Sequence, residues 1–401
     1  MQIEIRPYFS VIIPTRNRSA YLPDALESVS RQTFTDWEVV VSDNSDEFHA
    51  KINKSLVDGM SDPRIRYVRP PTSMSMVDHW EWAFRQARGR FLGVLTDRMA
   101  LRRHALDAVS DAISQTDCKV VCYQSENVSE FPGYKSIKVQ PPKSPVIINS
   151  TSKLAEFAKG VLSKDNPRCL NSFAERDLLE ALKTRHGSLF DGISPDYYMM
   201  FLLLAEISDY TCINERILLV QGEHLSNGRA NATGRPNASS SDFWKSIPPA
   251  RLDYMKKGPI PYDNTVMPNV ILREYHIVAD KTSSRKFPRI DIEAFYNEAV
   301  KYAAKLASSG DLGDATRETL DNFATMHGMS PLPIPTNRKR YGRELSNKIF
   351  TLPVLGSMVC FLRIISERFM VAVCGSKRMS ASKLSKIQDL AEEYRINHRS
   401  N

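Results

Sequence analysis

Three short apolar segments near the N-terminus each end on a polar side chain, and no other feature restricts the fold as strongly. They are Phe9–Thr15, Trp37–Asp43 and Arg90–Asp97, with helical stretches between them. Short apolar runs that alternate with helices are typical of the buried strands of a parallel sheet. Ligands of such sheets bind in the crevice outside the carboxyl ends of the strands. The pattern therefore predicts that the last residue of each segment lies at one edge of a sheet, beside a ligand.

The alternation continues along the chain and defines the fold class. Apolar residues recur at helical spacing in Leu22–Gln32, Met76–Arg88 and Leu101–Ser114, while Cys118–Gln124 and Cys212–Gln221 have the pattern of strands. We therefore predict an α/β fold with a mostly parallel, Rossmann-like sheet flanked by helices. A mainly helical C-terminal region is expected to follow it.

Two changes in composition divide the rest of the chain. Asn227–Ser241 is rich in Asn, Ser, Ala and Gly, which is typical of a loop, and Pro331–Pro335 is typical of a linker. We therefore predict three parts: an α/β domain over residues 1–240, a helical extension and linker over 241–335, and a basic, amphipathic helical tail over 336–401.

Composition indicates an ordinary globular protein, with 42% hydrophobic and 25% charged residues. The residues before the first apolar segment do not resemble a signal peptide. The six cysteines include no Cys-x-x-Cys pair and no zinc-like spacing, so we expect free thiols. Together these features predict a cytoplasmic protein.

The tail carries the whole excess of positive charge. Residues 331–401 contain 13 Lys and Arg against 5 Asp and Glu, so the first 330 residues are neutral within a chain of net charge +8. Its apolar stretch Ile349–Val373 is interrupted by charges and falls short of the ~20 apolar residues that a spanning helix needs. The stretch fits either an interfacial helix on the inner face of a membrane or a helix packed on the rest of the chain. No nucleic-acid partner is expected, because aromatic residues are few and no binding motif is present.

Six motifs near the N-terminus are specific when taken together, although each alone is weak. They are Ser10–Arg18 (SVIIPTRNR), Tyr21–Val29 (YLPDALESV), Gln32–Val41 (QTFTDWEVVV), Asp62–Arg69 (DPRIRYVR), Met76–Phe84 (MVDHWEWAF) and Ala87–Asp97 (ARGRFLGVLTD). In combination they closely resemble the start of a family 2 glycosyltransferase, and the resemblance fades near residue 230. It implies a GT-A fold, a nucleoside-diphosphate sugar as donor, and inversion at the anomeric carbon.

Glycosyl transfer requires that the nucleotide be held, that the leaving diphosphate be neutralised, and that the acceptor hydroxyl lose its proton. Asp43 could accept hydrogen bonds from the base or ribose, although acids are also common in turns such as this one. Pro14, Thr15 and Arg16 belong to the loop after the first segment, where Arg16 could bind phosphate or point into solvent. His224 follows the last predicted strand, where members of the family often have a residue near the diphosphate or metal.

The position that usually holds the metal in this family is unusual here. Members have Asp-x-Asp or consecutive acids, whereas this chain has Asp97, Arg98 and Met99. Mg²⁺ can be bound by one carboxylate together with substrate phosphate, so Asp97 could still hold Mg²⁺ or Mn²⁺. Alternatively, Arg98 could itself supply the positive charge to the diphosphate. The replacement of an acid by Met99 weakens the case for a metal, and both alternatives stay open.

Asp196 is the candidate general base. In the family, a carboxylate at the start of a helix below the acceptor site takes the proton, and Ser194–Tyr198 (SPDYY) matches that location. The acid that usually precedes it is absent, and an acid in the first turn of a helix is also favoured by the helix dipole alone. The apolar helix that follows must be buried and would hold the carboxylate rigidly. Asp191 is the alternative base.

Two functions from different classes fit these residues. The first is a glycosyltransferase that moves a sugar to a saccharide or lipid-linked acceptor in surface polysaccharide or glycolipid synthesis, with its basic tail on the membrane surface. The second is a catalytically silent GT-A-fold protein that binds nucleotide or serves as a scaffold in polysaccharide assembly. We predict the first, and Met99 and the absent acid before Asp196 are the evidence for the second.

Overall fold

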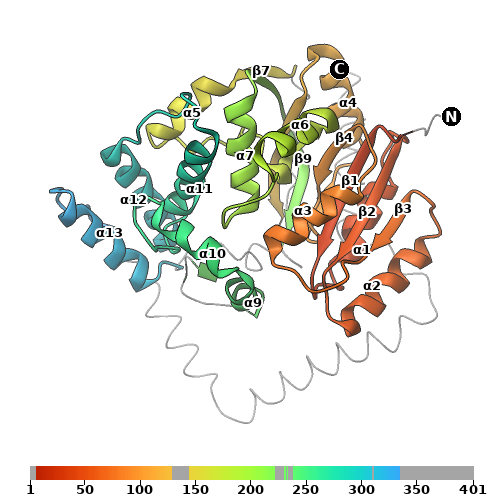
Figure 1. Cartoon of the computed structure of the whole chain (residues 1–401), viewed down its shortest axis with the longest axis horizontal. Coiled ribbons are helices and arrows are strands. Elements are labelled where there is room, and N and C mark those ends of the chain that lie inside the picture. Colours follow the sequence, from red (N-terminus) through yellow and green to blue (C-terminus); the bar gives the residue numbers. More distant parts are fainter. Residues whose placement is uncertain are drawn as a thin grey trace, which may run out of the picture.

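The computed structural model describes most of the chain (Figure 1). The described residues are 6–128, 144–221, 230–231, 233, 238–308 and 311–334. Within them, strands alternate with helices as far as Gln221, and helices follow. The predicted α/β fold with a helical C-terminal region is confirmed.

Four strands form a parallel half of the sheet, in the order β3-β2-β1-β4. They are β1 (Phe9–Thr15), β2 (Trp37–Asp43), β3 (Ile65–Val68) and β4 (Phe91–Val94). Every residue of β1 and β2 is buried, as expected of continuous apolar strands that are covered on both faces. The first two apolar segments of the sequence therefore coincide with the two central strands of this half.

The other half of the sheet is mixed. Its strands are β5 (Met99–Leu101), β6 (Val120–Val128), β7 (Val146–Asn149), β8 (Ser172–Glu175) and β9 (Asp209–Gln221). β8 is antiparallel to both β4 and β6, β6 is parallel to β9, and β5 and β7 are antiparallel to β9. The sheet is thus parallel where the sequence motifs lie and mixed beyond them.

Strand β5 corrects one expected boundary. The sequence pattern places the start of a helix at Leu101, but Met99–Leu101 pairs with Leu218–Val220 of β9, and α4 begins at Ala105. Apolar residues of so short a segment do not distinguish strand from helix. The consequence for function is that β5 fixes the backbone directly after Asp97.

Helices cover both faces of the sheet. Before Gln221 they are α1 (Leu22–Ser30), α2 (Glu47–Met60), α3 (Met76–Gln86), α4 (Ala105–Thr116), α5 (Ser150–Ala158), the short η1 (Cys169–Asn171), α6 (Arg176–His186) and α7 (Pro195–Glu206). Val11 and Ile13 of β1 pack into the core formed with α1 and α4, while Ile12 packs into the core formed with α3 and α7. This alternation is what a strand with two buried faces requires.

The C-terminal helices are α9 (Ala238–Ser246), α10 (Pro249–Leu252), η3 (Asp253–Lys256), α11 (Met267–Thr282), α12 (Ile292–Ser308) and α13 (Asp314–Met326). The last three share the second of these cores, whereas Met255 of η3 belongs to a separate small cluster with Ile193 and Ile247. α11 packs against α7, and one hydrophobic cluster extends from Ile12 to Phe323. The core is therefore continuous across residue 240, and the predicted domain boundaries stay predictions.

The predictions for the tail are not tested by the structure. Residues 336–401, with the stretch Ile349–Val373, lie outside the described residues. Within the part of the chain that is described, no helix is long and apolar enough to cross a membrane.

Candidate active site

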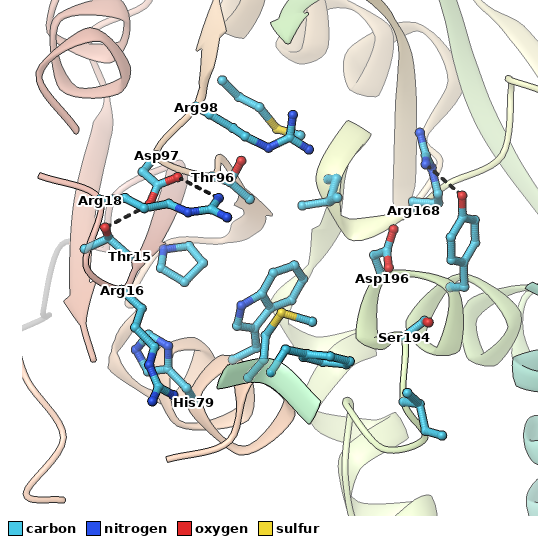
Figure 2. Close-up of a pocket in the computed structure, with 18 of the residues that line it drawn as sticks. Thr15, Arg16, Arg18, His79, Thr96, Asp97, Arg98, Arg168, Ser194 and Asp196 are labelled. Carbon is cyan, nitrogen blue, oxygen red and sulfur yellow. Dashed lines mark hydrogen bonds and ion pairs between the residues drawn. The ribbon is translucent and has the colours of Figure 1, made fainter. Parts of the chain in front are cut away.

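A cavity of about 840 Å³ lies outside the carboxyl ends of β1 and β4 and extends to α7 and α11 (Figure 2). Five arginines and three aspartates are among the residues that line it: Arg16, Arg18, Arg98, Arg168, Arg273, Asp97, Asp196 and Asp242. Basic clefts with low-dielectric walls concentrate anions. The cavity therefore occupies the expected edge of the sheet and has the charge that suits an anionic ligand.

Asp97 and Thr15 meet at this edge. The Thr15 hydroxyl donates a hydrogen bond of 2.9 Å to Oδ2 of Asp97, and Nη1 of Arg18 lies 3.7 Å from its Oδ1. Asp97 is 3% exposed, and this burial raises the pKa of its carboxyl above the ordinary value, although Arg18 and Thr15 counteract part of the rise. The end of β1 and the residues after β4 are thus joined directly, as the strand pattern predicts.

Asp43 ends β2 but is not among the described residues that line the cavity. Its buried carboxylate accepts hydrogen bonds from the Ser45 backbone N–H, from Nδ2 of Asn53 and from the hydroxyl of Tyr67, all between 2.8 and 2.9 Å. Both oxygens are thus used to fix the segment after β2. The neighbouring Asn44 lines the cavity instead. A direct contact of Asp43 with the nucleotide stays a prediction.

Pro14, Thr15 and Arg16 all line the cavity. Nη1 of Arg16 donates to the backbone oxygen of Met74 at 3.1 Å, so this side chain is anchored at the wall. Beside it, burial lowers the pKa of His79 to about 4, and the ring contacts the hydroxyl of Ser42 at 2.7 Å. His79 is therefore neutral at physiological pH.

Arg98 and Met99 are fixed by the pairing of β5 with β9. Nη1 of Arg98 donates to the backbone oxygen of Gln221 at 3.1 Å, and Met99 is buried and paired with Val220. The described residues contain no group of three or more His, Cys, Asp or Glu that could hold a metal. Asp97, the predicted metal ligand, already lies beside Arg18, and a metal at this position stays a prediction.

His224, which was predicted to lie near the diphosphate, falls outside the described residues.

Asp196 faces Asp97 from the opposite wall of the cavity (Figure 2). It is the second residue of α7, whose residues 198–205 are all buried, so the predicted apolar helix is confirmed. Burial raises the pKa of the Asp196 carboxyl above its ordinary value, and the Arg168 guanidinium opposes this. Arg168 itself is held by Tyr197, whose hydroxyl lies 3.3 Å from Nη1.

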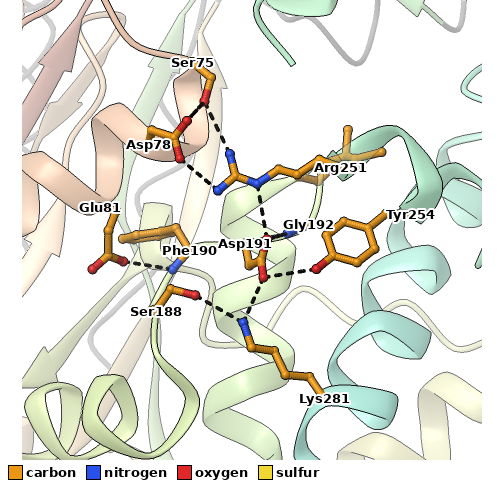
Figure 3. Close-up of polar contacts among 12 residues, drawn as sticks. Ser75, Asp78, Glu81, Ser188, Phe190, Asp191, Gly192, Arg251, Tyr254 and Lys281 are labelled. Atoms are coloured by element: carbon orange, nitrogen blue, oxygen red, sulfur yellow. Dashed lines mark hydrogen bonds and ion pairs between the residues drawn. The ribbon is translucent and has the colours of Figure 1, made fainter. Parts of the chain in front are cut away.

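Asp191, the alternative base, does not line the cavity. Its carboxylate accepts hydrogen bonds from Nε of Arg251 at 3.2 Å, the hydroxyl of Tyr254 at 3.2 Å and Nζ of Lys281 at 2.8 Å (Figure 3). Burial would raise the pKa of Asp191, but Lys281 and Arg251 lower it below its ordinary value. These contacts tie the loop before α7 to α10, η3 and α11, which is a structural task.

Several residues of the cavity were not singled out by the sequence. Arg18 and Asn44 lie within two residues of predicted positions, so local spacing could have identified them. Arg168 and Arg273 come from segments without a motif, and no local signal marks them.

The fold and the site together define an α/β protein with a basic ligand cavity at the carboxyl ends of its parallel strands. Residues 10–159 match the family model described as glycosyl transferase family 2. Residues 10–159 are therefore similar to a family 2 glycosyltransferase domain.

One relative adds context. The O-antigen biosynthesis protein RfbC of Myxococcus xanthus is 30% identical over 156 residues, which cover 38% of this chain. The match spans 12% of that relative's length.

Two solved structures are distantly similar. TarS 1–349 of S. aureus, in complex with UDP-GlcNAc, is 15% identical with a TM-score of 0.44, and 80% of this chain and 92% of that chain are covered. The mannosyltransferase PcManGT of Pyrobaculum calidifontis, in complex with GDP-Man and Mn²⁺, has a TM-score of 0.40 and is covered over 82% of each chain. Similarity at this level transfers no detail of the site.

Proposed function

We propose that the chain transfers a sugar from a nucleoside-diphosphate sugar to an acceptor hydroxyl, with inversion, during the synthesis of a surface polysaccharide or glycolipid. The observation that carries this proposal is the basic cavity with Asp97 on one wall and Asp196 on the other. The name of the Myxococcus xanthus relative supports the choice of pathway.

The donor would occupy the half of the cavity formed by the ends of β1 and β4. Pro14, Thr15 and Arg16 would contact the nucleotide, with the diphosphate directed toward Arg18 and Arg98. Arg carries a permanent charge on a planar group that can bind phosphate oxygens in pairs. These two guanidinium groups would stabilise the negative charge that develops on the leaving diphosphate.

The arginines are proposed in place of a metal because of the donor set around Asp97. The Asp97 carboxylate already lies beside Arg18, so a divalent cation would have to compete with that guanidinium group for it. Transfer would therefore depend little on added Mg²⁺ or Mn²⁺.

Asp196 would act as the general base. The acceptor oxygen attacks the anomeric carbon, the bond from that carbon to the phosphate oxygen breaks, and the nucleoside diphosphate leaves with the bonding electrons. The acceptor proton passes to the Asp196 carboxylate. The raised pKa of Asp196 makes it a stronger base than an exposed aspartate, while α7 holds it rigidly.

The test is turnover of the whole chain on a panel of UDP-, GDP- and dTDP-sugars, with release of the nucleoside diphosphate as the readout. Release from one nucleotide class, increased by a saccharide or lipid-linked acceptor, is the expected result. Tight nucleotide binding without turnover of any donor would instead support a silent scaffold protein.

We further propose that the basic tail rests on an anionic membrane surface. Residues 331–401 supply the positive charge, and each Lys or Arg near such a surface contributes about 1 kcal/mol. Vesicles with anionic lipid should retain the full chain and lose a chain ending at residue 335; equal retention of both would refute a role of the tail.

A further inference from the structure

Arg273 is a buried cation with an incomplete set of partners. It lies in α11, is 1% exposed and lines the cavity. Its Nη1 donates to Oδ1 of Asn264 at 2.8 Å and contacts the sulfur of Met255. Its Nε and Nη2 have no hydrogen-bond partner among the described residues. Buried charges in proteins are normally paired, so this arrangement calls for an anion from outside the chain.

Neither Glu274 nor Asp263, the two acids near Arg273, forms a hydrogen bond with it, although Oε2 of Glu274 also lacks a partner among the described residues. Oε1 of Glu274 accepts hydrogen bonds from the backbone N–H groups of Ile193 and Ser194 at 3.1 and 2.9 Å. Asp263 accepts from the backbone and side chain of Thr265, from the backbone N–H of Val266 and from Nδ2 of Asn269. Burial also raises the pKa of Glu274 to about 8, which leaves it mostly protonated at neutral pH.

Arg273 belongs to the same wall as the candidate base. α11 packs against α7, and Glu274 holds the backbone of Ser194, two residues before Asp196. Figure 2 shows Ser194, Asp196 and Arg168 together on this wall, opposite Thr15 and Asp97. Arg168 thus adds a second guanidinium group near Asp196.

We propose that Arg273, assisted by Arg168, forms an oxyanion-binding subsite, and that the acceptor therefore carries a phosphate or carboxylate group. That the bound anion belongs to the acceptor rests on the proposed function, whereas the anion-binding subsite itself does not. A guanidinium edge with two N–H groups matches two oxygens of such an anion. A neutral acceptor would leave Arg273 buried and unpaired, and sites with unpaired polar groups reject ligands that cannot satisfy them. Arg273 would thus select acidic acceptors over neutral ones.

The first test is calorimetric titration of the full chain with inorganic phosphate, glucuronate and glucose, each in the presence of a saturating nucleoside diphosphate that occupies the donor half. Phosphate or glucuronate should bind and glucose should not. Arg273→Gln should weaken anion binding at least tenfold. Arg102→Gln is the matched control, because Arg102 is also buried but is paired with Glu126 outside the cavity. That control should leave anion affinity unchanged.

A second variant keeps the test decisive if Arg273→Gln does not fold. Asn264→Asp places a carboxylate against Arg273, so it should raise Tm and also weaken anion binding at least tenfold. If neither variant changes anion binding, the proposed subsite is wrong. It is also wrong if no anion binds at all. Anion binding that depends on Arg273 in a chain that binds no nucleotide would uphold the subsite and reject the proposed function.

Discussion

The two walls of the cavity differ in how their charged groups are satisfied. On the wall formed by the ends of β1 and β4, Asp97 is held by Thr15 and Arg18, and Arg98 is held by the backbone of Gln221. On the wall formed by α7 and α11, Arg273 keeps two unpartnered nitrogens within the described structure. The charged groups of the first wall have partners within the chain, whereas Arg273 on the second wall has an incomplete set. We infer that the donor half is preorganised and that the acceptor half determines specificity.

The largest effect is expected from the base on the acceptor wall. Asp196→Asn should lower turnover by ~10²–10⁴-fold, because a positioned base contributes about that much to proton transfer. Nucleotide affinity should stay unchanged, since Asp196 lies on the opposite wall from the donor loops. Donor turnover and calorimetry on the same preparation measure both. A variant that keeps its rate would remove Asp196 from the mechanism.

The rate profile of the native chain provides an independent check. Asp196 must be ionised to accept a proton, so the rate should fall as pH falls through its pKa. Because burial raises that pKa, the acidic limb should lie above the ordinary value of 3.8.

The next effect concerns the donor wall. Arg98→Ala should weaken nucleoside-diphosphate binding by about 1.5–3 kcal/mol, or roughly ten- to a hundredfold, because it removes charged hydrogen bonds to phosphate. Arg98→Lys keeps the charge and should lose less. If the native chain and Arg98→Ala bind the nucleoside diphosphate with equal affinity, groups other than Arg98 hold the diphosphate.

A smaller effect, on stability, distinguishes the structural role of Asp191 from the catalytic role proposed for Asp196. Asp191→Asn weakens its pairs with Arg251 and Lys281 and should lower the free energy of unfolding by about 1–3 kcal/mol. Turnover should change little, because Asp191 does not line the cavity. The control is Asp253→Asn, which breaks an exposed pair with Lys256 and should leave Tm unchanged. A large loss of turnover in Asp191→Asn, with Tm preserved, would restore Asp191 as the base.

The last effect is a loss of stability that grows as the pH rises above 4.5. The pKa of Glu274 rises from 4.5 to about 8 on folding, so the folded chain binds the extra proton and stability falls as pH rises between these values. Glu274→Gln removes that titration. Its Tm should equal that of the native chain near pH 5 and exceed it above pH 8. A constant difference in Tm across this range would contradict a buried, neutral Glu274.

The same contrast explains what the sequence could predict. β1 and β2 are continuous apolar strands with polar ends, so their bounds and the meeting of Thr15 with Asp97 follow from local pattern. Arg273 lies within an ordinary helix, and its importance arises from the absence of a partner in three dimensions. Asp43 shows the limit within the motifs themselves, because its place at a strand end is also explained by its bonds to Asn53 and Tyr67.

The most direct test of the central claim is calorimetric titration of the full chain with UDP, GDP and dTDP, with Mg²⁺ or Mn²⁺ and again with EDTA. Arginines that neutralise the diphosphate predict tight binding of one nucleotide that survives EDTA. Binding that requires the metal would contradict this account of the donor wall. Binding of none of the three nucleotides would contradict the proposed donor site itself.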